Sequence, residues 1–144
     1  GLKIKNSFLI SNHKYLVRTK SKLNLYVLLV NPGIKCLSKD IYFRNRRFSK
    51  SYPKKISSNF YKLFNLKKIK LDRNDLEQVV FKIYPKIKVL NNFIKEQENC
   101  IFSRMTGSGS TCVGYFNKLA SAKKAKKIIQ RKFPSYWCVT AKTI

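Results

Sequence analysis

The segment Ser103–Thr111 carries the residue types best suited to holding an oxyanion. It places glycines at 107 and 109 among hydroxyl side chains at 106, 108, 110 and 111. Glycine permits positive φ angles and close backbone approach, and successive amides in such a turn form a concavity that binds anions. A plain hairpin turn is the alternative, and no Lys follows the second glycine as in a Walker motif. The candidate residues that lie near a substrate phosphate are Gly107, Ser108, Gly109, Ser110 and Thr111.

A second polar group, Asn74-Asp75-Leu76-Glu77, has the spacing of a capping box. In such a box Asn74 accepts a hydrogen bond from a first-turn amide, and Glu77 reaches back to the amide of Asn74. We therefore expect Asn74 and Asp75 to cap a helix, in preference to contacting a ligand.

The other reactive side chains are scattered along the chain. Four cysteines, at 36, 100, 112 and 138, form no C-x-x-C pair, and His13 is the only histidine, so we expect no metal site. The cysteines are interpreted as buried small apolar residues, with a Cys100–Cys112 disulfide left open. No secretory leader is recognised near Gly1, and scattered thiols favour a cytoplasmic location.

Hydrophobic patterning indicates the elements that position these residues. Two short strands are expected within 7–20, and a strongly apolar stretch at 23–30 predicts a strand buried on both faces. Further strands are expected at 100–105, 111–116 and 136–140. Helices are expected after an N-cap at Ser38, through 57–64, from Asn74 with a kink or a break into two helices near Tyr84, and over 121–133. The basic stretch 44–55 is expected to be a surface loop.

From residue 23 onward this order reads β-α-(α)-α-β-β-α-β. It predicts an α+β fold of the split β-α-β (ferredoxin-like) type, a four-stranded antiparallel sheet with helices on one face. We assign 23–144 to this domain, and 1–22 to a strand hairpin or the end of a preceding domain.

The charge of the chain admits two interpretations. Lys and Arg number 32 against 6 Asp and Glu, a formal net charge of +26, which is typical of nucleic-acid-binding proteins. However, Lys, Asn and Ile together fill 50 of 144 positions, and an AT-rich genome encodes such a composition without selection for phosphate binding. The longest apolar run, Leu25–Val30, is too short to span a membrane.

The segment R-M-T-G-S-G-S-T-C-x-G-x-F, at 104–116, resembles the third conserved motif of the GHMP kinases. Three further stretches are similar to one branch of that family, in matching order across about 23–144. These are the strand, Pro-Gly and helix of 29–42, the Asn-Asp-Leu-Glu of 74–77 with Pro85 further on, and the aromatic-ended Pro-Ser-Tyr-Trp of 134–137.

The resemblance implies the C-terminal domain of a two-domain kinase. That kinase transfers the γ-phosphate of ATP, with Mg²⁺, to a hydroxyl of a cytidine-diphosphate-linked methylerythritol, in non-mevalonate isoprenoid biosynthesis. In the family, the ATP loop, the catalytic Asp and Lys and most cytidine contacts lie in the N-terminal domain. That domain is then the partner in cis, ATP and Mg²⁺ bind mainly there, and this chain carries no catalytic residue and is inactive alone. The resemblance also implies that the loop Gly107–Thr111, which matches the third motif, faces the substrate and supports the ATP loop.

The alternative is a basic RNA-binding domain, because the RNA-recognition motif has a similar α+β scaffold. That motif needs aromatic side chains where 106–111 has Gly, Ser and Thr. We therefore expect nucleic acid to bind only nonspecifically, through charge.

Overall fold

The computed structural model describes residues 7–10, 15–18, 24–45 and 66–143, and these fall in two units. In the unit comprising 1–24, 49–73 and 144, strands β1 (Ser7–Ile10) and β2 (Tyr15–Arg18) pair antiparallel, which confirms the predicted hairpin. The same unit contains the short helix α2 (Leu66–Leu71), which patterning missed. The turn containing His13, the helix expected through 57–64 and most of the basic loop 44–55 lie outside the described residues.

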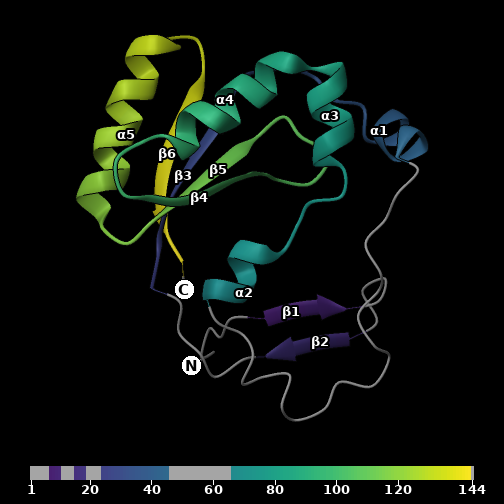
Figure 1. Ribbon diagram of the computed structural model, residues 1–144, viewed down its shortest axis with the longest axis horizontal. Helices are drawn as coiled ribbons and strands as arrows, with labels where there is room; N and C mark the ends of the chain where they lie inside the picture. The colour runs from purple at the N-terminus through teal and green to yellow at the C-terminus, as the bar shows by residue number, and fades with distance from the viewer. Residues whose placement is uncertain (1–6, 11–14, 19–23, 46–65, 144) are drawn as a thin grey trace. The chain divides into compact units, whose positions relative to one another are not determined.

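The second unit, 25–48 with 74–143, contains a four-stranded antiparallel sheet (Figure 1). Its strands are β3 (Tyr26–Asn31), β4 (Cys100–Met105), β5 (Cys112–Phe116) and β6 (Trp137–Lys142), in the order β4-β5-β3-β6. The first and last strands of the unit are therefore neighbours at β3 and β6. At their shared end, the amide of Leu25 donates to Thr143 Oγ1 at 2.9 Å, and the amide of Thr143 donates to the carbonyl of Leu25 at 2.8 Å.

The main helices pack on one face of this sheet, as the sequence predicts (Figure 1). Helix α4 (Pro85–Lys95) packs on β4 and β5, and α5 (Leu119–Lys132) packs on β3, β5 and β6. Helix α3 (Glu77–Ile83) precedes α4, and α1 (Ser38–Arg44) contacts α3. The predicted break is confirmed between α3 and α4, and Pro85 is the first residue of α4. A proline is tolerated there because the first N–H of a helix makes no hydrogen bond within the helix.

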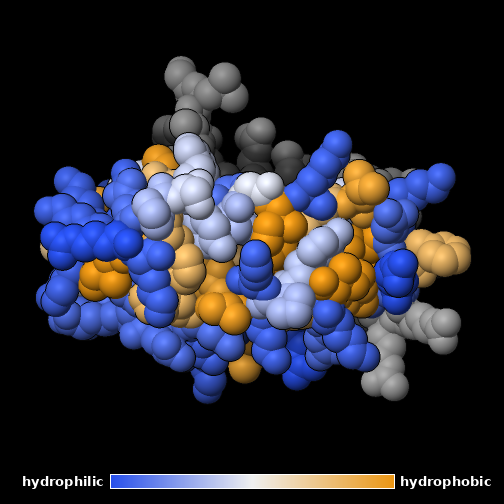
Figure 2. Space-filling model, turned by 90° about the horizontal axis from the view of Figure 1, so that it is seen from above, coloured by the Kyte–Doolittle hydropathy of each residue, from blue (hydrophilic) through white to orange (hydrophobic). Residues whose placement is uncertain are grey.

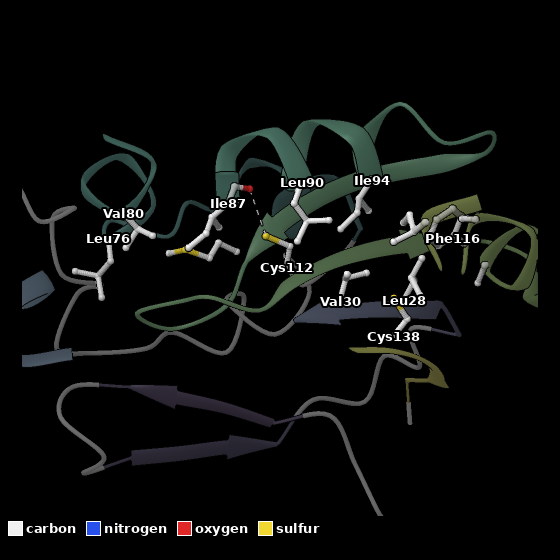
Figure 3. Packing of buried hydrophobic residues seen from close by; sticks show 14 of the residues in the cluster. Leu28, Val30, Leu76, Val80, Ile87, Leu90, Ile94, Cys112, Phe116 and Cys138 are labelled. Carbon is white, nitrogen blue, oxygen red and sulfur yellow. Dashed lines mark hydrogen bonds between the residues drawn. The ribbon is translucent and has the colours of Figure 1, made fainter. Parts of the chain in front are cut away.

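The core lies between the sheet and these helices (Figure 3). Leu28 and Val30 of β3 are fully buried beneath Ile87, Leu90 and Ile94 of α4 and residues of α5. Val27 and Leu29 alternate with them and are only half-buried. The prediction of a strand buried on both faces is therefore wrong for β3, because the helices of this unit cover one face only.

Gly114 in the middle of β5 sets how closely α4 approaches the sheet. A Cβ atom added to Gly114 would stand 2.5 Å from Cγ2 of Ile94 and 3.1 Å from Cε2 of Phe116. Both neighbours are fully buried. Only a residue without a side chain fits at this point of the β5–α4 packing.

All four cysteines are free thiols. Cys100 lies opposite Phe116, and Cys112 lies opposite Met105, so the hairpin places the two cysteines at opposite ends. The Cys100–Cys112 disulfide is thereby excluded. Cys112 and Cys138 are buried, as predicted, whereas Cys36 and Cys100 are only half-buried, so the prediction of four buried cysteines is wrong for these two. Burial raises the pKa of the Cys112 thiol to about 12.

On the side seen from above the helices, hydrophilic residues cover most of the surface and surround hydrophobic patches (Figure 2). Apolar side chains exposed on the described surface include Phe43, Ile83 and Val89. Lys124 and Glu98 form an ion pair on the surface, and both partners are exposed. Among the described helices, none has the length and apolarity needed to cross a membrane.

Candidate functional site

The glycine-rich segment forms the connection between β4 and β5. The amide of Thr106 donates to the carbonyl of Thr111 at 2.9 Å, which closes the hairpin, and the amide of Gly109 donates to the carbonyl of Thr106 at 3.0 Å. The turn 106–109 has φ +52° at Gly107. A positive φ at the first central residue is the pattern of a primed turn, for which glycine is preferred.

Gly109 is required for both its conformation and its packing. Its φ is +89°. A Cβ atom at this position would meet Met105 Sδ at 3.0 Å and Cys36 Sγ at 3.3 Å. The backbone of Gly109 is therefore pressed against two sulfur-bearing side chains, one from β4 and one from the segment before α1.

Asn31, the last residue of β3, holds the end of the loop. Its Nδ2 donates to Thr111 Oγ1 at 2.9 Å, and its Oδ1 accepts from the amide of Gly33 at 2.7 Å. The hydroxyl of Ser110, which is buried, lies 3.5 Å from the same Oδ1. Thr111 Oγ1 accepts from Asn31, so its own proton stays available for a ligand.

Ser38 holds the middle of the loop instead of capping a helix. Helix α1 begins at Ser38 itself, Leu37 is the N-cap residue, and no side chain caps this end. The hydroxyl of Ser38 lies 2.7 Å from the hydroxyl of Ser108. The N-cap predicted at Ser38 is wrong, because the hydroxyl bonds the loop in preference to its own helix.

Asn74 and Glu77 also contact the loop, and the capping box expected from their spacing does not form. Asn74 Oδ1 accepts from the amide of Leu76 at 3.1 Å, but α3 begins at Glu77 without a side-chain cap. Asn74 Nδ2 donates to the carbonyls of Met105, at 2.9 Å, and Gly107, at 2.8 Å. Glu77 Oε1 accepts from the amide of Met105 at 2.9 Å, in place of the amide of Asn74.

Asp75, the other expected cap residue, provides no side-chain cap for α3. It lines a groove of about 700 Å³ between α1 and α3, together with Arg44, Gln78 and Lys82. None of the described residues that line this groove belongs to 106–111.

The chemistry available at the loop suits an oxyanion. Among the described residues, the amides of Gly107, Ser108 and Ser110 donate no hydrogen bond to another group. Amides and hydroxyls in such a turn match phosphate or sugar oxygens. Mg²⁺ prefers carboxylate ligands, and the described residues contain no group of three or more His, Cys, Asp or Glu that could hold a metal ion. The donor set at the loop does not fit a metal.

Sequence reasoning missed two of the side chains that hold this loop. The sequence predicts that Asn31-Pro32-Gly33 ends a strand, although an amide side chain at that point also signals a local turn. It predicts that Glu77 bonds within the entrance of its own helix. In each case the partner of the side chain is distant in sequence, by 80 residues for Asn31 and Thr111.

Comparison with known proteins connects this domain to kinases. Residues 59–135 match the family model described as GHMP kinases C terminal. The 4-diphosphocytidyl-2-C-methyl-D-erythritol kinase of Pelagibacter ubique is 36% identical over 144 residues, which are all of this chain and 50% of that protein. The protein of the same name from Wolbachia pipientis wMel is 36% identical over 125 residues, 87% of this chain and 43% of its own length. The chain spans about half the length of these curated relatives.

Two solved structures share the fold. A crystal structure of 4-(cytidine 5'-diphospho)-2C-methyl-D-erythritol kinase aligns with a TM-score of 0.66 and 18% identity, over 90% of this chain and 47% of that one. Homoserine kinase from Cytophaga hutchinsonii aligns with a TM-score of 0.55 and 12% identity, over 96% of this chain and 47% of that one. These relatives and structures are all kinases, and none of them supports the RNA-binding alternative.

Proposed function

This chain belongs to the GHMP kinase family, as a C-terminal domain of it, and we propose that it is the substrate-side domain of a kinase that phosphorylates 4-diphosphocytidyl-2-C-methyl-D-erythritol. The observation that carries this proposal is the Pelagibacter relative of that name, whose similarity extends over the whole of this chain. The reaction then belongs to the synthesis of isoprenoid precursors and has an alcohol as its phosphate acceptor.

In this proposal the loop Gly107–Thr111 contacts oxygen atoms of the substrate. Two free amides, at Gly107 and Ser108, lie on a turn whose shape is held by hydrogen bonds at both ends. The Thr111 hydroxyl adds a donor from the end of the loop. Preorganised donors of this kind stabilise phosphoryl oxygens without having to rearrange during the reaction.

ATP and Mg²⁺ are the cofactors that we propose for the whole enzyme, in which ATP supplies the phosphoryl group and Mg²⁺ neutralises its charge. The described residues do not fit a metal, as stated above, so we assign ATP and Mg²⁺ binding mainly to the N-terminal kinase domain in cis. We assign the catalytic residues to that domain as well.

We propose that this chain has two partners, the cytidine-diphosphate-linked substrate and the N-terminal kinase domain, and that it does not bind a membrane. Nucleic acid would bind only nonspecifically, through the net charge of +26. The four free thiols support a cytoplasmic location.

The proposal is tested by assaying ATP-dependent phosphorylation of the methylerythritol substrate. We expect the 144-residue chain alone to be inactive, and a protein that joins it to its N-terminal kinase domain to be active. In the active protein, Thr111→Val should lower turnover about tenfold, the effect of losing one hydrogen bond to a charged group. Thr140→Val, the same substitution on β6, is the matched control.

A correctly folded two-domain protein without activity on this substrate would contradict the proposal. Equal turnover for Thr111→Val and Thr140→Val would show that the Thr111 hydroxyl does not contact the substrate and that the loop acts only as a structural turn.

A further inference from the structure

Asn74 makes a set of hydrogen bonds that its place before a helix does not require. An Asn that only shapes a helix entrance needs its side-chain oxygen, and Asn74 uses that oxygen on the amide of Leu76. Both hydrogens of its side-chain amide are then free to act elsewhere, since an NH₂ group carries two donors. They reach across to the β4–β5 connection, 31 and 33 residues away.

The two acceptors lie on either side of Thr106. One is the carbonyl of Met105, the last residue of β4, and the other is the carbonyl of Gly107, inside the turn. Because one nitrogen bonds both carbonyls, at 2.9 and 2.8 Å, the distance between strand end and turn is fixed by a single planar group. The peptide that follows Gly107 carries the free amide of Ser108, so the direction of that donor depends on this bridge.

Glu77 completes the arrangement from the next residues of the chain. Among the described strands β4 lies at the edge of its sheet, so none of them pairs with its outer backbone groups. At Met105 they are taken by side chains, the amide by Glu77 and the carbonyl by Asn74. The side chains of Asn74, before α3, and Glu77, its first residue, thus bond the outer backbone groups of Met105, where a further strand would otherwise pair.

We infer that Asn74 is a positioning residue for the proposed phosphoryl transfer, holding the glycine-rich loop so that its free amides point at the substrate. This inference rests on the proposed function. It assigns to the side-chain NH₂ group of Asn74 a role in turnover that is separate from its contact with Leu76.

The substitution Asn74→Asp separates these two roles. The aspartate has the same shape and keeps an oxygen for the amide of Leu76, but it places a second oxygen where the NH₂ group faced two carbonyls. Asn92→Asp, at an exposed position of α4, makes the same change of charge away from the loop and is the matched control. Asn74→Ala removes both roles and measures how much stability they supply together.

The first measurement uses this chain and amide NMR. In Asn74→Asp we expect the amide resonances of Gly107 and Ser108 to shift while the thermal midpoint stays closer to the parent chain than that of Asn74→Ala. Below the ordinary Asp pKa of about 4, the protonated carboxyl can donate again, so the resonances should move back toward their original positions. Unchanged loop resonances in Asn74→Asp would overturn the inference.

The second measurement uses the two-domain kinase, with Asn92→Asp in parallel. We expect Asn74→Asp to lower kcat at least tenfold, with a smaller change in KM, and to lower the thermal midpoint less than Asn74→Ala does. If the Asn92→Asp protein is active and Asn74→Asp matches it in kcat and KM, the positioning role is refuted while the proposed function stands. If the parent kinase is inactive, the proposed function fails and the role in turnover fails with it, whereas the NMR result still decides whether Asn74 shapes the loop.

Discussion

The contact between Gly114 and α4 allows a stability change to be worked out from the structure. In Gly114→Ala, the new methyl carbon would stand 2.5 Å from Cγ2 of Ile94. Two carbon atoms pack at about 3.5–4.0 Å, so the helix or the strand must move by about 1 Å. The side chains of Ile94 and Phe116 cannot move aside easily, because both are fully buried.

Overpacking of this size in a filled core costs about 1–3 kcal/mol. At this chain length, 1 kcal/mol lowers the thermal midpoint by about 2–4 °C. Thermal and urea unfolding of Gly114→Ala, followed by far-ultraviolet circular dichroism, should therefore show a lower midpoint with an unchanged m-value.

A double-mutant cycle with Ile94→Ala identifies the cause. Ile94→Ala alone should cost about 2–5 kcal/mol, because it leaves a cavity. In the double variant the new methyl group partly fills that cavity, so the combined loss should be smaller than the sum by at least about 1 kcal/mol. Losses that add within about 0.5 kcal/mol would refute the reasoning, since independent sites behave in that way.

Three further predictions concern single groups. Burial raises the Cys112 pKa from 9.0 to about 12, so above pH 9 the folded state keeps a proton that the unfolded state loses. The free energy of unfolding, measured with urea, should therefore fall as the pH rises above 9, and it should fall less steeply in Cys112→Ala. Pro85→Ala should change stability by less than about 1 kcal/mol in the same assay, because the first residue of α4 needs no helical N–H bond. The Lys124 ammonium, by its hydrogen bond and charge, lowers the Glu98 pKa, but both side chains are exposed; Glu98→Gln should therefore leave the thermal midpoint at neutral pH unchanged, and a clear drop would contradict this.

The sheet and its helices could be predicted because their residues repeat a local pattern. Apolar residues spaced along α4 and α5 indicate one buried face each, and Pro85 marks the boundary between α3 and α4. The half-buried state of Val27 and Leu29 could not be predicted, because an apolar run looks the same whether one or both faces of its strand are covered.

The loop could be located from its glycines, but not the side chains that hold it. Asn74 and Glu77 have the spacing of a local capping box, but in the folded chain their side chains bond Met105 and Gly107. Local and distant backbone partners are chemically alike, so only the tertiary arrangement decides between them. The contact between Ser38 and Ser108 is hidden in the sequence for the same reason.

The pairing of β3 with β6 gives the second unit a direction of mechanical weakness. Leu25 and Thr143, the first and last residues of this unit, bond each other at one end of the two antiparallel strands. A force that separates these two residues would load the hydrogen bonds between the strands one after another, as in a zipper, instead of all at once. Asn31 and the loop it holds lie at the other end of β3, about 20 Å away at 3.3 Å per residue. A pull on Leu25 and Thr143 would therefore reach the glycine-rich loop last.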